Sequence, residues 1–159
     1  MNNVFLLLGS NLGDRNLLLQ QAILNIETDI GPVVKKSSVY ETQSWGKIDG
    51  PDYLNRVIEI QTGLEAQTIL QKILAIEQTM GRKREEKWGS RVIDIDILFF
   101  NSAIINEPGL HVPHPELHKR RFTLEPLAEI APDLIHPVLK KNSSQLKNEL
   151  QDSLIVKKI

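Results

Sequence analysis

The sequence contains no cysteine, which excludes a disulfide framework, thiolate metal sites and catalysis by a thiol nucleophile. Neither sign of charge predominates: the formal net charge is −1 and the isoelectric point is about 6.4, so no global field recruits nucleic acid or an anionic membrane. No segment approaches the ~18 consecutive apolar residues of a membrane span. The apolar run at residues 4–8 has no basic residue before it, unlike a signal peptide. We therefore expect a cytoplasmic protein that binds neither nucleic acid nor a membrane.

The length of 159 residues suits one domain, which buries roughly 68–70% of the surface of the unfolded chain. Hydrophobic residues form 41% and charged residues 25% of the sequence, as in an ordinary globular protein. No internal repeat, low-complexity tract or Gly/Ser/Pro-rich linker divides the chain. Residues 1–159 are therefore expected to form a single domain.

The hydrophobic periodicity predicts short strands that alternate with amphipathic helices. Strands are expected at residues 4–8, 33–42, 53–62 and 92–100, and helices between the cap Asp14 and Gly31 and at residues 65–80. This β-α-β-β-α-β order is that of ferredoxin-like α+β folds, in which helices cover one face of a mostly antiparallel sheet. Six prolines between Pro108 and Pro137 predict a loop-rich C-terminal extension, ending in a short helix capped by Ser143 or Ser144.

Two acids interrupt an apolar strand pattern, because Asp94 and Asp96 lie within the run VIDIDILFF at residues 92–100. Charged carboxylates in such a run are costly to bury unless something binds them. Residues two apart on a strand point to the same side, so these carboxylates project together, with Cβ atoms roughly 6.5–7 Å apart. That spacing suits a pair of hard cations about 3.5–4 Å apart. The alternative is that each acid pairs with an arginine on a neighbouring strand.

A basic segment separates the second helix from this strand, and it contains Arg82, Lys83, Arg84, Lys87 and Arg91. Guanidinium groups pair with phosphate in a bidentate manner, so the segment is predicted to act as a mobile lid that binds polyphosphate beside the acids. The alternative is a solvated loop whose charges do little.

Glu77 lies on the apolar stripe of the second helix, because Leu70, Ile73, Leu74 and Glu77 follow the spacing i, i+3, i+4 and i+7. The pattern leaves two environments open for this carboxylate. It belongs either to the functional site or to the edge of the stripe, in water.

Three of the four histidines lie close together in the sequence, at His111, His114 and His118. The prolines between them prevent the helix that would bring histidines at i and i+4 together, which disfavours a zinc site. Donation to phosphate oxygens by one or two of these histidines, with Arg120 nearby, fits the pattern better.

The strand at residues 53–62 is expected to place Leu54 and Ile58 on one face and Tyr53 and Asn55 on the other. An aromatic ring beside an amide can stack on a flat heterocycle and hydrogen-bond its edge. A half-buried surface pair is the alternative.

The common phosphate-binding motifs GxxxxGK[ST] and the kinase Gly-rich loop are missing. Blocks over nearly the whole chain instead resemble the 6-hydroxymethyl-7,8-dihydropterin pyrophosphokinase family: GSNLGDR, YLN, GRKR, KWGSRVIDIDIL, VPHPELHKRRF and PLAEIAPDLIHP. The run KWGSR-x-x-D-x-D is the most specific of them. The resemblance implies transfer of pyrophosphate from ATP to the hydroxymethyl group of the pterin in folate biosynthesis. The implied mechanism is in-line attack on the β-phosphorus, with AMP leaving.

The resemblance also implies roles for individual residues. The catalytic positions are Arg82, Arg84, Arg91, Asp94 and Asp96, and the ligands of two Mg²⁺ ions are Asp94 and Asp96. The ATP-binding positions are Leu70, Glu77, Arg84, Trp88, Arg91, Ile97, His114 and Arg120. The pterin-binding positions are Thr42, Trp45, Tyr53, Asn55, Trp88, Asp94 and Phe122, with the rings of Tyr53 and Phe122 on opposite sides of the pterin. We expect a monomer.

Two other functions can be weighed from the same residues. A nucleotidyltransferase of the polymerase-β kind also carries Gly-Ser before an Asp-x-Asp strand, but here Gly9-Ser10 precedes Asp94 by over eighty residues. A ferredoxin-like ligand-sensing module would keep both acids as structural groups, and it would not need an arginine-rich lid.

Overall fold

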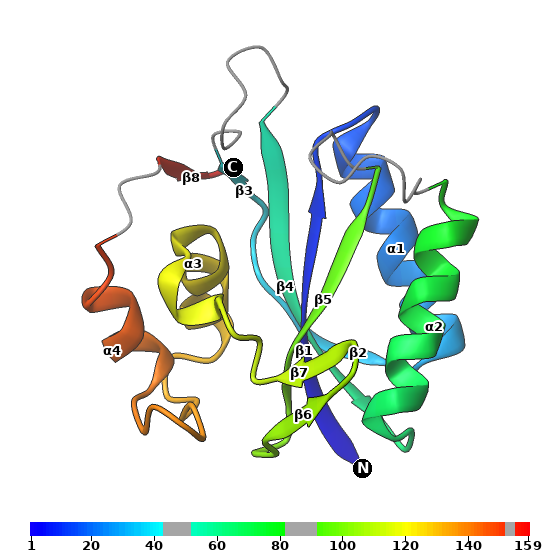
Figure 1. Ribbon diagram of the computed structural model, residues 1–159. Helices are drawn as coiled ribbons and strands as arrows, with labels where there is room; N and C mark the ends of the chain where they lie inside the picture. Colours follow the sequence, from blue (N-terminus) through cyan, green and yellow to red (C-terminus); the bar gives the residue numbers. More distant parts are fainter. Residues whose placement is uncertain (43–51, 82–91, 152–154) are drawn as a thin grey trace.

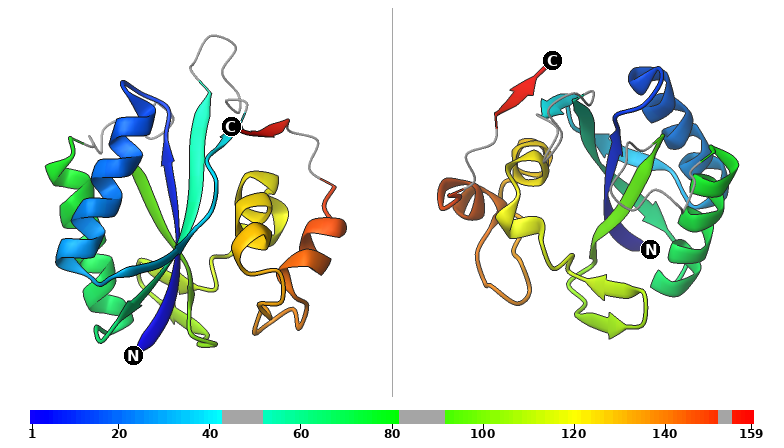
Figure 2. Two further views of the ribbon diagram at one scale, coloured as in Figure 1. Left: turned by 180° about the vertical axis from the view of Figure 1, so that it is seen from behind. Right: turned by 45° about the horizontal axis from the view of Figure 1, so that its top comes forward.

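The computed structural model describes residues 1–42, 52–81, 92–151 and 155–159, which form a sheet with helices on both faces (Figures 1 and 2). The strands of this sheet are β1 (Asn2–Ser10), β2 (Val33–Lys36), β3 (Tyr40–Thr42), β4 (Tyr53–Thr62), β5 (Asp94–Phe100) and β8 (Val156–Lys158). A separate hairpin consists of β6 (Ile105–Glu107) and β7 (Leu110–Val112). The helices are α1 (Arg15–Asp29), α2 (Ala66–Thr79), the 3-10 turn η1 (Leu117–Lys119), α3 (Arg121–Ile130) and α4 (Ser143–Asn148).

The sheet has the strand order β5-β1-β4-β3-β8, and β2 also pairs with β4. Each of these pairs is antiparallel, and β1 pairs with β4 along its whole length, from Asn2 opposite Thr62 to Ser10 opposite Leu54. Helix α1 connects β1 to β2, and α2 connects β4 to β5. This is the predicted β-α-β-β-α-β order, so the α+β, ferredoxin-like fold class is confirmed.

Alternating residues of the central strands supply two hydrophobic cores, one on each face of the sheet. On the face covered by α1 and α2, the core includes Val4, Leu6, Leu8, Ile23, Ile26, Ile58, Ile60, Ile69, Ile73, Ile95 and Ile97. On the face covered by α3 and α4, it includes Phe5, Leu7, Val57, Leu98, Phe99, Leu124, Leu127 and Leu146. The sequence predicted helices on one face only. The second layer comes from the C-terminal third, whose helix α3 was not expected.

Helix α1 begins, and helix α2 ends, at the residue that the sequence indicates. The Asp14 side chain caps α1 by accepting a hydrogen bond from the Leu17 backbone N–H at 3.2 Å. Gly81 follows the end of α2 with a φ of 95°, a conformation that residues with a Cβ rarely adopt.

The predicted strand at residues 33–42 is wrong in one respect, because it is two strands separated at Ser37. The buried Ser37 hydroxyl accepts a hydrogen bond from the Val57 N–H at 3.0 Å, and it donates to the Ser38 carbonyl at 2.7 Å. The Ser37 carbonyl accepts instead from the Arg56 Nε–H at 2.6 Å. A side chain therefore takes the place of a backbone carbonyl in the ladder, which ends β2 and lets β3 begin three residues later.

The C-terminal third holds more regular structure than its prolines predicted. Helix α3 contains the buried Pro126, which lacks an N–H, and it forms because Leu124 and Leu127 pack into the second core. The cap of α4 is Asn142 rather than Ser143 or Ser144. The Asn142 side chain accepts from the Gln145 N–H at 2.8 Å, and the Gln145 side chain accepts from the Asn142 N–H at 2.8 Å.

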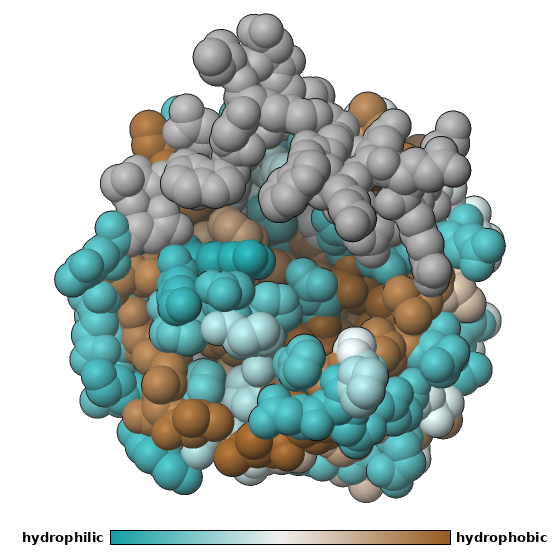
Figure 3. Space-filling model, in the orientation of Figure 1, coloured by the Kyte–Doolittle hydropathy of each residue, from teal (hydrophilic) through white to brown (hydrophobic). Residues whose placement is uncertain are grey.

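Apolar side chains are exposed at the lower left of Figure 3, where the loop between α3 and α4 lies. In this loop Ile135 and Val138 are exposed. Among the helices of the described residues, none combines the length and the apolar composition that crossing a membrane requires.

Candidate active site

Predicted site residues gather at one end of the sheet, where β1 and β3 end and β4 and β5 begin (top of Figure 1). Asp94, Gly9, Asn55 and Tyr40 lie side by side on four adjacent strands, because Gly9 pairs with both Asp94 and Asn55, and Asn55 pairs with Tyr40. The next pair along β3 and β4 joins Thr42 to Tyr53. Residues that are far apart in the sequence therefore form one row across the sheet.

The two acids project toward the α3 side of the sheet. Ile95 and Ile97 pack into the core on the α1–α2 side, so the alternate residues Asp94 and Asp96 face the other way. Among the described residues β5 pairs with β1 alone, and the residues directly opposite the two acids are Gly9 and Leu7. Neither of these two directly opposite residues is an arginine.

Two buried side chains of β4 and β3, on the same face of the sheet as the acids, have polar atoms without a hydrogen-bond partner in the described part of the chain. Asn55 is 5% exposed and Thr42 is 3% exposed, and the atoms concerned are Asn55 Oδ1 and Thr42 Oγ1. Leaving such a group unpaired costs about 1–3 kcal/mol, and proteins rarely do so without a reason. These atoms mark a place where a polar ligand can bind.

Gly9 has no side chain, and this leaves space for the side-chain amide of Asn55. A Cβ atom at Gly9 would lie 2.7 Å from Asn55 Nδ2, which is shorter than real Cβ contacts. The amide therefore lies against the backbone of β1, held between two strands. This close approach requires glycine at the position.

Aromatic side chains of two different layers lie on the same side of the sheet as this row. Tyr53 is the first residue of β4, is half-buried, and lies on the same face of the strand as Asn55. Phe122 lies on α3, which covers that face, and packs against the second core. The Arg120 guanidinium carbon is 5.5 Å from the centre of the Phe122 ring. That the two rings enclose a ligand remains a prediction.

His114 lies near both an acid and a base of the predicted site. Burial lowers the pKa of His114 from its usual 6.5, attraction to Asp96 opposes this, and repulsion from Arg120 adds to it. His114 Nδ1 accepts a hydrogen bond from the Glu116 N–H at 3.1 Å. The neutral ring therefore carries its proton on Nε2, where it can donate to an anionic ligand.

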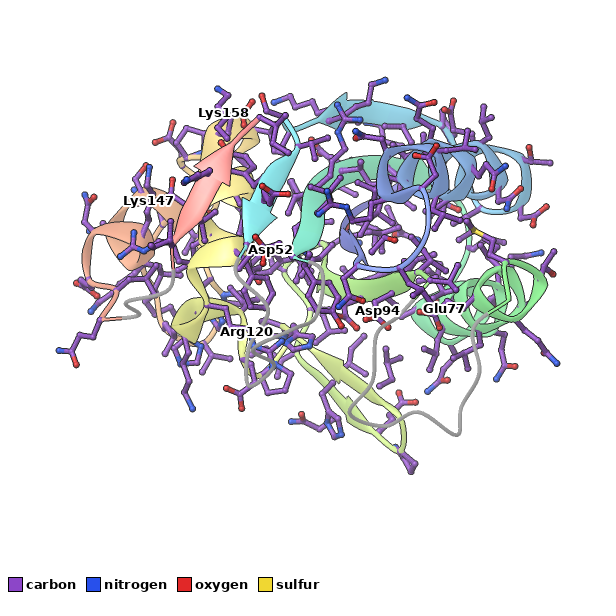
Figure 4. All side chains as sticks on the ribbon, turned by 90° about the horizontal axis from the view of Figure 1, so that it is seen from above. Asp52, Glu77, Asp94, Arg120, Lys147 and Lys158 are labelled. Atoms are coloured by element: carbon purple, nitrogen blue, oxygen red, sulfur yellow. The ribbon has the colours of Figure 1, made fainter. Side chains whose placement is uncertain are left out.

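The donor set at Asp94 and Asp96 fits a hard cation that the protein shares with its ligand. Mg²⁺ is usually bound by one or two carboxylates together with substrate phosphates and water. Both acids are half-buried, and no group of three or more His, Cys, Asp or Glu side chains that could hold a metal occurs among the described residues. Asp94 lies between Arg120 and Glu77 when the molecule is seen from above (Figure 4).

The predicted ATP-binding residues Leu70, Glu77 and Ile97 lie on the other side of β5. Leu70 and Ile97 belong to the core under α1 and α2. Glu77 is 3% exposed, and its Oε2 accepts a hydrogen bond from the Ile95 N–H at 2.9 Å. The alternative that placed this carboxylate in water is therefore wrong. Glu77 instead fixes the edge strand β5 between the two acids.

Five predicted site residues fall outside the described part of the chain: Trp45, Arg82, Arg84, Trp88 and Arg91. Their roles stay predictions. The histidines do not form one cluster: His111 is exposed beside Asn106, His114 lies near Asp96, and His118 packs against His136 with ring centres 6.2 Å apart.

Sequence reasoning missed Gly9 and Tyr40 as members of this row. Gly9 lies in the motif GSNLGDR, but its position opposite Asn55 depends on strand register. Tyr40 closes the row by donating from its hydroxyl to Glu129 Oε1 of α3 at 2.7 Å, and burial raises its pKa. No local signal in the sequence indicates that contact.

Comparison with known proteins identifies the family. Residues 5–132 match the profile described as 7,8-dihydro-6-hydroxymethylpterin-pyrophosphokinase (HPPK). The chain is 43% identical over 149 residues to a 2-amino-4-hydroxy-6-hydroxymethyldihydropteridine pyrophosphokinase of Aquifex aeolicus, covering 94% of this chain and 92% of the relative. It is 44% identical over 132 residues to the protein of that name from Bacillus subtilis, covering 82% of this chain and 79% of the relative.

Solved structures show the same fold. The Plasmodium falciparum HPPK-DHPS wild-type structure with STZ-DHP matches with a TM-score of 0.77 at 20% identity, over 93% of this chain and 43% of that one. The chain thus spans less than half the length of these HPPK-DHPS proteins. Because its sequence matches the family profile over most of its length, the chain belongs to the 7,8-dihydro-6-hydroxymethylpterin-pyrophosphokinase (HPPK) family.

Proposed function

We propose that this chain transfers pyrophosphate from ATP to the hydroxymethyl group of 6-hydroxymethyl-7,8-dihydropterin, giving AMP and the pterin diphosphate, a step of folate biosynthesis. The observation that carries the proposal is the row at the end of the sheet. Two buried polar atoms, Asn55 Oδ1 and Thr42 Oγ1, lie at the same end and on the same face of the sheet as two carboxylates. The polar heterocycle of a ligand would hydrogen-bond the two buried atoms, and its phosphate chain would reach the carboxylates through bound cations.

In this proposal the pterin binds over β3 and β4, below α3. The pterin edge presents an amide and an amino group, which match the acceptor of Asn55 and the hydroxyl of Thr42. The rings of Tyr53 and Phe122 supply stacking surfaces from β4 and α3, and Asp94, opposite Gly9, lies where the hydroxymethyl arm would point. Trp45 and Trp88, outside the described residues, would complete the pocket.

ATP binds along the outer edge of β5, with which no other strand of the described residues pairs. The Ile95 N–H points away from β1, toward Glu77. Backbone groups two residues apart on a strand point the same way, so those of Ile97 also point away from β1. There they can hydrogen-bond the edge of the adenine. Leu70 would pack against the base. The triphosphate then reaches Asp94 and Asp96, with His114 Nε2 and Arg120 on its other side.

Asp94 and Asp96 would hold two Mg²⁺ ions, which when bound supply charge neutralisation across the triphosphate. The chain itself contributes orientation. Asn55 and Thr42 fix the acceptor, while Arg120 and His114, with Arg82, Arg84 and Arg91 of the basic segment, hold the phosphates in line. The hydroxymethyl oxygen forms a bond to the β-phosphorus, the bond from that phosphorus to the α–β bridging oxygen breaks, and AMP leaves with the electron pair. The hydroxyl proton passes to solvent or to an oxygen near the acids.

The proposal also takes residues 1–159 as one domain that acts as a cytoplasmic monomer. Sedimentation of the purified chain tests the monomer, since a self-associating protein sediments faster as its concentration rises.

Product analysis tests the activity. The protein is incubated with ATP, Mg²⁺ and the reduced pterin alcohol, and the nucleotide products are separated. AMP that appears only when the pterin is present supports pyrophosphoryl transfer. Release of pyrophosphate would indicate a nucleotidyltransferase, and the absence of turnover would indicate a ligand-sensing module.

A further inference from the structure

Arg15 ends the motif GSNLGDR, and no role discussed above uses it. It is the first residue of α1, where a positive charge opposes the helix dipole. The first turn of α1 contains no acidic residue that would compensate, apart from the cap Asp14 before it. An arginine at this position therefore does not serve the helix, and its contribution must lie in what the side chain contacts.

The Arg15 guanidinium joins two segments that are far apart in the sequence. Its Nη1 donates to Glu41 Oε2 at 3.0 Å and to the Asp52 carbonyl at 2.7 Å. Glu41 precedes Thr42 on β3, and Asp52 precedes Tyr53, the first residue of β4. Thr42 and Tyr53 are directly paired across the two strands. One nitrogen atom thus ties the end of β3 to the start of β4 at the pair that faces the candidate site.

Arg15 acts from the opposite side of the sheet. Tyr40 points toward α3, where it bonds Glu129, so the alternate residue Glu41 points toward α1 and Thr42 points back to the α3 side. Arg15 therefore does not reach the face that carries Thr42 Oγ1 and Asn55 Oδ1. Its effect on that face must pass through the backbone of β3 and β4.

We infer that Arg15 is a positioning residue that sets the separation of Thr42 and Tyr53, and so the width of the pterin site. This inference rests on the proposed function. Arginine suits the role because it keeps its charge and presents donors in a rigid plane, whereas lysine is a point charge on a flexible stem. The Arg15 and Glu41 side chains are 29% and 34% exposed, so their attraction adds little to overall stability. The effect on ligand binding should therefore exceed the effect on folding.

The fold should survive replacement of Arg15. Glu41 lies directly opposite Lys157 on β8, so a cationic residue stays on the neighbouring strand when Arg15 is replaced. Arg15→Met also removes an unfavourable charge from the start of α1 and keeps most of the side-chain volume. Arg15→Lys keeps the charge and loses the planar donor. The matched control is Lys141→Met, which removes a cation from the 2.7 Å ion pair with Glu149 beside α4.

The experiment measures the affinity of the wild-type protein and these variants for two probes by calorimetry. The probes are a non-hydrolysable ATP analogue with Mg²⁺, and 6-hydroxymethylpterin added to the protein saturated with that analogue. Arg15→Met should bind the pterin roughly two- to tenfold more weakly, the effect of losing one or two partly exposed hydrogen bonds. The affinity of Arg15→Met for the ATP analogue should stay within about twofold of wild type. The affinities of Lys141→Met for both probes should stay within the same range. A twofold change in affinity is smaller than the effect of losing one hydrogen bond. Arg15→Lys should fall between Arg15→Met and the wild type.

Hydrogen exchange of the ligand-free protein gives a second readout. The amides of residues 40–42 and 53–55 should exchange faster in Arg15→Met than in Lys141→Met. Unchanged pterin affinity, unchanged exchange at these amides, or an equal loss of affinity for both probes would overturn the inference. A wild-type protein that binds the ATP analogue but neither binds nor turns over the pterin would overturn the proposed function, and the inference with it.

Discussion

Replacing Gly9 with alanine tests how the row across the sheet is built. Gly9 lies on β1, where alanine adopts the backbone conformation without strain. Its added Cβ would lie 2.7 Å from Asn55 Nδ2, while ordinary van der Waals contact begins at 3.4 Å. The amide must therefore retreat by about 0.7 Å or change rotamer. Asn55 is buried, so the movement displaces the unpaired Oδ1 that we assign to the pterin.

The expected loss follows from the hydrogen bonds that Asn55 offers. Losing a buried hydrogen bond whose partner then stays unpaired costs about 1–3 kcal/mol. Pterin affinity should thus fall roughly five- to 150-fold in Gly9→Ala, since 1.4 kcal/mol is a factor of ten. Affinity for an ATP analogue should change little, because the nucleotide is assigned to the outer edge of β5.

Calorimetric titration of Gly9→Ala, Asn55→Ala and the double variant measures these losses. If Gly9→Ala acts only by displacing Asn55, it should add little further loss of pterin affinity in the Asn55→Ala background. Two losses that simply add would show that Gly9 acts through something other than the amide. Unchanged pterin affinity in Gly9→Ala would refute the assignment of Asn55 to the pterin.

Three further predictions concern other parts of the molecule. Phe122→Ala should weaken pterin binding by roughly ten- to a hundredfold through loss of a stacking surface and leave binding of an ATP analogue nearly unchanged, by calorimetry; the reverse pattern would move the pocket elsewhere. Asp94→Asn and Asp96→Asn should each abolish AMP formation while circular dichroism shows an intact fold, and normal turnover at ordinary Mg²⁺ would contradict the metal assignment. Burial, with repulsion from His118, lowers the pKa of His136 below its usual 6.5. The unfolded chain therefore binds a proton at this histidine more readily than the folded protein does. The free energy of unfolding should fall as the pH drops below about 6.5. In His136→Asn, which keeps an acceptor for the Val138 N–H, urea titrations should show a weaker fall, and an identical pH profile would contradict the assignment.

The elements that the sequence predicted well are those whose patterns are local. Strand β1, helix α1 and strand β4 follow from hydrophobic periodicity and from the Asp14 cap. The break between β2 and β3 could not be predicted, because it depends on the Ser37 hydroxyl bonding Val57 twenty residues away. Helix α3 was missed because Pro126 is unfavourable in isolation. Its cost is outweighed by tertiary packing that no local pattern reveals.

The candidate site divides in the same way. Asp94 and Asp96 could be recognised because two acids in an apolar strand violate a local rule. The meeting of Gly9 with Asn55, and of Arg15 with Glu41, depends on which strands pair and in what register. The buried environment of Glu77 was left open by the sequence, because a helical stripe does not specify which strand edge faces it.

A crystal structure of the protein with a non-hydrolysable ATP analogue, Mg²⁺ and 6-hydroxymethylpterin tests the central claim most directly. We predict the pterin ring between Tyr53 and Phe122, with its edge hydrogen-bonded to Asn55 Oδ1 and Thr42 Oγ1. Metal density should lie within coordination distance of Asp94 and Asp96 and of the phosphate oxygens. A pterin bound away from Asn55, or a triphosphate held without metal at these two acids, would contradict the account.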